Sequence, residues 1–175
     1  MRVSFLALSA GLILASLPVA SDAQRADNDI LPASVALQKQ GEAAQHQGNL
    51  DAAVDYYESA LAADPRNRSA IIALAQVARA QGLPGKAIGL YREALLLEPN
   101  DLTALTGQGE ALADKGAVEI AREKLADAQR VCRGECPQVA ALERAISAAG
   151  ETKRVVAADA VAPKPAVTTT ASSQN

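Results

Sequence analysis

A spacing of 34 residues recurs through the middle of this chain of 175 residues. Glycine forms one series of three positions with this spacing, alanine forms two more, and tyrosine and proline each recur once. The members are Gly48, Gly82 and Gly116; Ala53, Ala87 and Ala121; Ala60, Ala94 and Ala128; Tyr57 and Tyr91; and Pro65 and Pro99. A fixed period of about 20–50 residues is typical of stacked supersecondary units, and about 34 residues suits a helix–turn–helix unit. The period therefore predicts a repeat architecture.

Each unit contains two stretches with helical spacing, split near the repeating glycine. In the second unit, Ile71, Leu74 and Ala78 fall on one face of the first stretch, and Tyr91 and Leu95 fall on one face of the second. The two prolines end the second stretches, because the residue before a proline is pushed out of helical geometry. Two antiparallel helices cannot bury their apolar faces alone, so the units must stack. We expect three helix pairs and a final helix, with no strand.

The repeated small and aromatic residues predict how the helices pack. Alanine lets two helix backbones approach closely, and one tyrosine in a unit fills the wedge between units. The residues that we expect to be buried are Ala53, Tyr57, Ala60, Ala87, Tyr91 and Ala94. The acidic residues that we expect on the solvated faces include Asp55, Glu58 and Glu93. A low aromatic content of 2% also suits closely packed helices better than a sheet.

The pattern resembles that of the tetratricopeptide repeat family over about residues 34–133. The matching positions are Gly41, Ala53, Tyr57, Ala60 and Pro65 in the first copy, and Leu74, Ala75, Ala87, Tyr91, Ala94 and Pro99 in the second. The third copy keeps Gly109, Gly116, Ala121 and Ala128, but it has Leu125 in the aromatic slot and Arg133 in place of proline. The resemblance implies an all-α, right-handed superhelix with repeats at residues 34–67, 68–101 and 102–135.

The first residues have the layout of a targeting segment. Arg2 precedes an apolar run over residues 3–19, and small residues follow at 21–23. This order is typical of a bacterial secretory signal peptide. We expect residues 1–23 to be removed before Gln24, or after Ala20, which makes the protein periplasmic or secreted without membrane insertion. Retention of the segment as an uncleaved anchor is the alternative.

Two cysteines, Cys132 and Cys136, are the only ones in the chain. Their spacing is not that of thioredoxin-like Cys-x-x-Cys sites, and no histidine follows as in c-type haem attachment. An even count in an exported chain predicts a disulfide, and Gly134 permits the tight turn that it needs. We interpret the pair as a structural staple at the end of the third repeat. A redox or metal-binding pair is the alternative.

Residues 137–149 predict an amphipathic helix that caps the last repeat, because a terminal repeat exposes an apolar face that needs a cover. Its apolar face carries Val139, Leu142, Ala145, Ile146 and Ala149. Gly150 is the expected end of this helix. A partner-binding helix is the alternative.

Both flanks of the repeat region lack a helical pattern. Residues 150–175 change to alanine, valine, threonine, serine and proline without periodicity, which predicts a disordered tail. Residues 24–33 form a lead-in, with Ser34 as the expected cap of the first helix.

Enzymatic and metal-binding patterns are not found in the sequence. His46 is the only histidine, so a multi-histidine metal site is excluded, and the carboxylates are scattered over helix faces. The glycines do not form a phosphate-binding loop. We therefore expect no catalytic residue, no metal and no cofactor. A net charge of −3 without a basic patch also disfavours nucleic acid as a partner.

The resemblance implies a groove, lined by the first helix of each repeat, in which members of the family bind peptide segments or helices. The positions that match this groove are Gln38, Glu42, Gln45, His46, Ser69, Ile72, Gln76, Arg79, Thr103, Thr106, Glu110 and Asp114. We expect binding to depend most on Ile72 and Arg79, because the middle repeat contacts both neighbours. Reversal of charge at Arg79 is expected to abolish binding and leave the thermal melt unchanged.

The partner expected from these residues is a protein or peptide. The lysine- and asparagine-rich clamp with which some family members hold an acidic C-terminal tail is absent, and Glu42, Glu110 and Asp114 favour a neutral or basic segment. The sequence thus predicts a non-catalytic scaffold of the bacterial cell envelope. An accessory factor in pilus, secretion or envelope assembly, and a thiol-dependent redox or metal protein, are the alternatives. Nothing in the sequence sets the oligomeric state.

Overall fold

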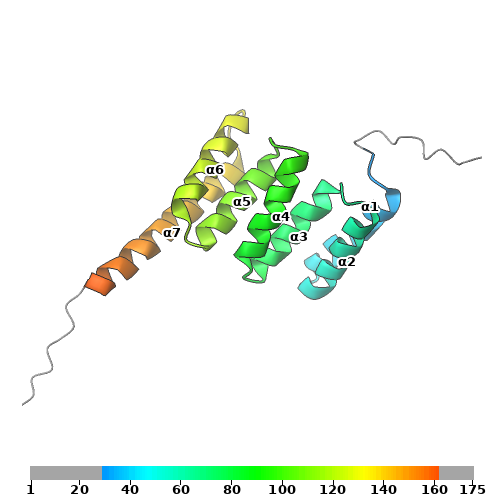
Figure 1. Ribbon diagram of the computed structural model, residues 1–175, viewed down its shortest axis with the longest axis horizontal. Helices are drawn as coiled ribbons and strands as arrows, with labels where there is room; N and C mark the ends of the chain where they lie inside the picture. Colours follow the sequence, from blue (N-terminus) through cyan, green and yellow to red (C-terminus); the bar gives the residue numbers. More distant parts are fainter. Residues whose placement is uncertain (1–28, 162–175) are drawn as a thin grey trace, which may run out of the picture.

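The computed structural model describes residues 29–161, with side chains up to residue 152. Seven α-helices and no strand occur in this part of the chain: α1 Pro32–His46, α2 Leu50–Ala63, α3 Arg68–Ala80, α4 Pro84–Leu97, α5 Leu102–Asp114, α6 Val118–Val131 and α7 Pro137–Val161. Three helix pairs stand side by side, and α7 packs on the last of them (Figure 1). The expected all-α solenoid is confirmed. The expected signal peptide, residues 1–23, lies outside the described residues.

The turns and breaks fall where the sequence predicts them. Gly48, Gly82 and Gly116 have φ angles of 76°, 74° and 80°, and each lies between the two helices of its pair. This left-handed conformation strongly favours glycine, because a side chain would clash with the backbone. Residues 64 and 98 are extended before the two repeated prolines, so α2 and α4 end there.

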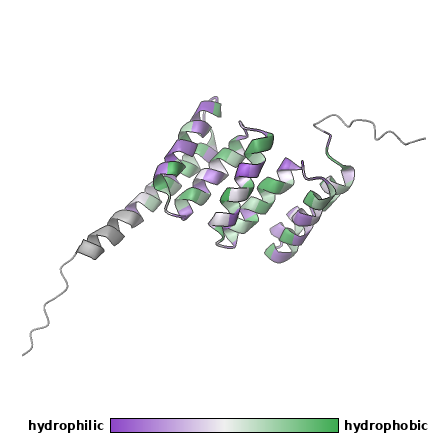
Figure 2. Ribbon diagram, in the orientation of Figure 1, coloured by the Kyte–Doolittle hydropathy of each residue, from purple (hydrophilic) through white to green (hydrophobic). Residues whose placement is uncertain are grey.

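Tyr57 and Tyr91 sit in narrow spaces between helices, and glycines make that space. A Cβ atom added to Gly41 of α1 would lie 2.6 Å from the Tyr57 ring, and one added to Gly107 of α5 would lie 2.4 Å from the Tyr91 ring. Tyr57 is fully buried and Tyr91 is 2% exposed. All six residues expected to be buried are buried, and the three expected acidic residues are exposed. Hydrophobic and hydrophilic residues both occur along the helices of the stack (Figure 2).

Helix α7 completes the packing of the third repeat. Leu142 of α7 is fully buried, and a Cβ atom added to Gly109 of α5 would lie 2.7 Å from it. Gly109 has the register of Gly41, so Leu142 fills the place that the Tyr57 ring fills in the first repeat, while Leu125 is only half-buried. The Sγ atoms of Cys132 and Cys136 lie 1.97 Å apart and join the end of α6 to the start of α7.

Two expectations about the ends of the repeat region are wrong. Helix α7 does not end at Gly150 but continues to Val161, so the first part of the expected tail is helical. A single glycine inside a helix costs only about 1 kcal/mol, and the alanines before Gly150 and the glutamate after it favour the helix. Gly150 is also not among the glycines with positive φ. No helix in residues 29–161 is both long and apolar enough to cross a membrane.

Ser34 is not the cap of α1. The helix begins at Pro32 with Leu31 as its N-cap, because the fixed φ of proline suits the first helical position. The Ser34 hydroxyl is buried, donates to the carbonyl oxygen of Ala60 at 2.7 Å and accepts from Nδ2 of Asn67 at 2.9 Å. It therefore ties the first helix to the end of the first repeat.

Candidate functional site

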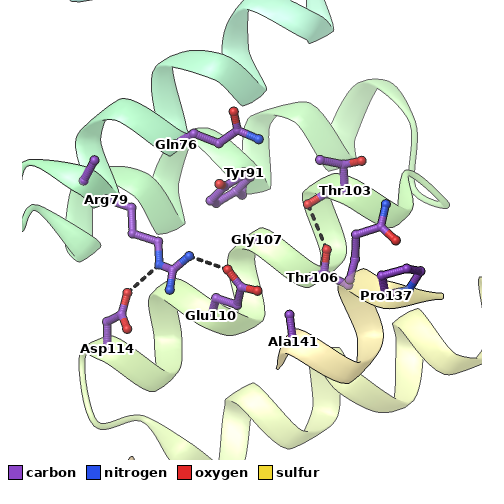
Figure 3. Close-up of a pocket in the computed structure, with 12 residues that line it drawn as sticks. Gln76, Arg79, Tyr91, Thr103, Thr106, Gly107, Glu110, Asp114, Pro137 and Ala141 are labelled. Atoms are coloured by element: carbon purple, nitrogen blue, oxygen red, sulfur yellow. Dashed lines mark hydrogen bonds and ion pairs between the residues drawn. The ribbon is translucent and has the colours of Figure 1, made fainter. Parts of the chain in front are cut away.

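Two clefts adjoin on the side of the stack formed by the first helices of the pairs and by α7. Both contain Gln76 and Thr103. The N-terminal cleft, of about 460 Å³, has lining residues that include Gln38, Glu42, Gln45, His46, Ser69, Ile72, Gln76 and Thr103. The C-terminal cleft, of about 630 Å³, has lining residues that include Gln76, Arg79, Thr103, Thr106, Glu110 and Asp114 (Figure 3). Every position predicted for a groove therefore lines one cleft or both, and its role in binding stays a prediction.

Sequence reasoning missed several lining residues. Pro137 and Ala141 of α7 line the C-terminal cleft. They stand 34 residues after Thr103 and Gly107, so continuing the repeat register past the third repeat identifies α7 as the next inner helix. In the N-terminal cleft the missed residues include Arg68 and Asp101, which pair at 3.0 Å.

Arg79 is not a free cation. Its Nε donates to Oδ2 of Asp114 at 2.5 Å, and its Nη1 pairs with a carboxylate oxygen of Glu110 (Figure 3). Burial lowers the pKa of Arg79, but the hydrogen bond to Asp114 and the charges of both carboxylates outweigh it and raise that pKa. The three side chains tie α3 to α5. The expectation that charge reversal leaves the melt unchanged is therefore inconsistent with this structure, because a glutamate here meets two carboxylates.

Ile72 contributes little apolar surface to the N-terminal cleft. It is 9% exposed and belongs to the core cluster that includes Ala75, Tyr91 and Ala104. Its side chain is used mainly in stacking the second and third repeats, so it is a weaker candidate for ligand contact than the sequence suggested.

The N-terminal cleft has an internal network of polar side chains. Nε2 of Gln38 donates to Oε1 of Glu42 at 2.8 Å, and the Tyr57 hydroxyl donates to Oε1 of Gln45 at 2.8 Å. Burial, and then the charge of Glu42, raise the pKa of Tyr57 to about 12. His46 is exposed at the edge of this cleft.

The C-terminal cleft differs at the tyrosine. Arg79 takes the register position of Gln45, so Tyr91 has no amide oxygen beside it. No hydrogen bond to the Tyr91 hydroxyl is made by any residue in the described part of the chain, although Tyr91 lines the cleft. Burial raises the pKa of Tyr91 to about 12, with Arg79 opposing and Glu110 reinforcing the shift. The phenol is therefore neutral at physiological pH and is a potential donor.

The side chains that line the two clefts are mostly polar. Among the residues that the structure describes, no group of three or more histidine, cysteine, aspartate or glutamate side chains is placed to hold a metal ion. The cleft residues are amides, hydroxyls and paired charges, which are suited to hydrogen bonding with a ligand.

Three solved structures of similar shape are tetratricopeptide (TPR) domains. The first such domain of Spaghetti (RPAP3), bound to the HSP90 peptide SRMEEVD, is 21% identical with a TM-score of 0.63, covering 68% of this chain and 94% of that one. The Sgt2 domain from Aspergillus fumigatus is 22% identical with a TM-score of 0.64, covering 81% and 92%. The second domain of human RPAP3, in complex with the HSP70 peptide SGPTIEEVD, is 18% identical with a TM-score of 0.61, covering 65% and 94%. At these identities the likeness concerns the fold.

The family follows from the sequence itself. No curated protein sequence matches the chain. The tetratricopeptide repeat model matches residues 6–68, 39–101 and 72–138, which together span most of the chain. The repeat period, the paired helices and this match lead to one conclusion: the chain belongs to the tetratricopeptide repeat family.

Proposed function

We propose that this protein is a non-catalytic interaction module that holds an extended segment of a partner protein across its two clefts. One observation carries the proposal: the clefts share Gln76 and Thr103, so a single segment can run from α1 to α7. Tetratricopeptide domains are protein–protein interaction modules, and two of the similar domains are bound to peptides. These likenesses support a peptide-like ligand.

The cleft chemistry favours a neutral or basic segment. The charged side chains that line the two clefts are the carboxylates Glu42, Asp101, Glu110 and Asp114 and the guanidinium groups Arg68 and Arg79. Acids outnumber bases, and both guanidinium groups already pair with carboxylates. We therefore expect the acidic peptide SRMEEVD, which the Spaghetti domain binds, to bind this protein weakly or not at all.

Site-directed photo-crosslinking tests the proposal. A photoreactive amino acid at Gln76, which is exposed in both clefts, should capture a partner from envelope extract, whereas one at Glu93, which is exposed on α4, should not. The captured segment is then made as a synthetic peptide, and its affinity for the purified protein is measured. Equal capture from Glu93, or a peptide that does not bind, would contradict the proposal.

We also propose that the protein acts in the bacterial cell envelope, with Cys132 and Cys136 oxidised as a structural staple. The support is the signal-like order of residues 1–23 together with the cysteine pair next to α7. An accessory role in pilus, secretion or envelope assembly is a narrower form of this proposal. Cell fractionation, the mass of the N-terminal peptide and a free-thiol count test it. A cytoplasmic, full-length chain with two free thiols would refute it.

A further inference from the structure

We propose that the C-terminal cleft binds a non-acidic peptide segment through one main-chain carbonyl, which accepts a hydrogen bond from the Tyr91 hydroxyl. This inference rests on the proposed function and names the donor and the ligand chemistry within it. It assigns a ligand contact to a side chain of α4, which is the second helix of its pair. The groove positions predicted from the sequence all lie on the first helices of the pairs.

The position of Tyr91 is the first support. Its side chain is 2% exposed, and it lines the cleft. A Cβ atom at Gly107 would lie 2.6 Å from the hydroxyl oxygen, so the hydroxyl end of the ring lies directly over the backbone of α5 (Figure 3). Among the described side chains, the Tyr91 hydroxyl is not one of the polar atoms that are both fully buried and without a partner. Because it has no hydrogen-bond partner, its oxygen keeps some exposure, and it faces the cleft between α3, α5 and α7.

The comparison of Tyr57 with Tyr91 is the second support. Tyr57 and Tyr91 stand in the same register, and the Tyr57 hydroxyl donates to Gln45 at 2.8 Å. In the second repeat Arg79 replaces that acceptor with a group that only donates hydrogen bonds. The Tyr91 hydroxyl consequently lacks an acceptor among the described residues. The first repeat provides an acceptor for its tyrosine hydroxyl, whereas the second repeat leaves its tyrosine hydroxyl available to a ligand.

The Tyr91 hydroxyl favours ligands that carry an acceptor, because a buried hydroxyl without a hydrogen bond costs free energy. Solvent in the open cleft can accept its hydrogen bond. A ligand that displaces this solvent must supply an acceptor, or a buried donor remains unsatisfied. An extended peptide offers a carbonyl at every residue, which makes its main chain a suitable partner for a single donor at a fixed place.

The surrounding charges exclude an acidic segment. The charged side chains lining this cleft are Arg79, Glu110 and Asp114, and the guanidinium group is held by both carboxylates. The cluster carries one net negative charge next to Tyr91. A neutral carbonyl is accepted there, a nearby lysine or arginine is favoured, and a carboxylate is repelled.

The test uses peptides selected from a random linear library displayed on phage, with the full chain as the target. Selected peptides are synthesised, and binding is measured with the wild type, with Tyr91→Phe and with the matched control Tyr57→Phe. We expect Tyr91→Phe to weaken binding about two- to tenfold, which corresponds to one neutral hydrogen bond, and to leave the thermal melt unchanged. Tyr57→Phe should lower the melt, because it loses the bond to Gln45.

A second measurement identifies the acceptor. A thioamide, which is a poorer acceptor than an amide, is placed at one peptide position at a time. One position should weaken binding to the wild type but not to Tyr91→Phe, and glutamate substitutions near it should weaken binding further. If the peptides bind, lose affinity on Gln76→Trp and are indifferent to Tyr91→Phe, this inference is wrong and the proposed function stands. If no selected peptide depends on Gln76, the proposed function fails.

Discussion

Replacement of Gly107 by alanine should destabilise the protein, even though alanine is the better helix former. The new Cβ atom would lie 2.4 Å from Cζ of Tyr91. Carbon atoms in contact lie about 3.5–4.0 Å apart, so the ring has to move by about 1 Å or more. Tyr91 belongs to the tight cluster that contains Ala75, Ala87 and Ala104, and this cluster leaves the ring little room.

The magnitude follows from two opposing terms. Alanine in place of glycine inside a helix stabilises by about 1 kcal/mol. Overpacking a core costs about 1–3 kcal/mol, and a rigid ring between two helices belongs at the upper end of that range. The free energy of unfolding should therefore fall by about 1–2 kcal/mol, which corresponds to a decrease in Tm of about 4–8 °C.

Gly89→Ala is the matched control. Gly89 lies inside α4, and a Cβ atom there would meet nothing within 4 Å apart from its chain neighbours and the backbone of its own helix. The helix propensity gain is then unopposed, so this variant should be about 0.5–1 kcal/mol more stable than the wild type. Urea denaturation and thermal melts followed by circular dichroism measure both variants. If Gly107→Ala is stabilised as much as Gly89→Ala, the Tyr91 ring does not lie over Gly107 and the reasoning fails.

Three further predictions follow from the contacts. The pKa values of Tyr57 and Tyr91 are raised to about 12 in the folded protein, so the stability that these phenols contribute is complete below about pH 10 and is lost as the pH rises from about 10 to about 12. Urea midpoints measured across this range test the prediction. Phenylalanine at both positions should reduce the fall in stability. Arg79→Glu should lower the free energy of unfolding by about 1 kcal/mol, and added salt should reduce the difference in Tm from the wild type. An unchanged melt would show that the ion pairs contribute nothing to stability. Replacing Cys132 and Cys136 by serine should cost about 2 kcal/mol, measured against the oxidised wild type, and a reductant should lower only the wild-type melt.

The sequence by itself determined the helix pairs, their turns and their breaks. These features depend on local chemistry: only glycine adopts positive φ without strain, and a proline ends the helix before it. They recur because every unit makes the same contacts with its neighbours, so the period carries information about packing as well as length. The period also predicted which positions line the clefts. Glu42, Gln76 and Glu110 occupy the same position in the first helices of the three pairs, and all three line a cleft.

The period did not show where the last helix ends. A glycine near a helix end is a common stop, but its cost is small, and the helix-forming residues on both sides of Gly150 carry α7 past it. The role of Ser34 was also hidden, because its partners are Ala60 and Asn67, which lie far along the chain. Local capping rules do not include such partners.

The tertiary structure decided which polar groups of the clefts are already used. Arg79 pairs with Glu110 and Asp114, which stand 31 and 35 residues further along the chain. The spacing of residues within one helix does not predict a contact between such distant positions. The Tyr57 hydroxyl finds an acceptor 12 residues before it, whereas the equivalent position beside Tyr91 holds a donor. A repeat pattern describes what the units share. Hydrogen bonds between individual side chains depend on how the units differ, and they appear only when the helices are placed in space.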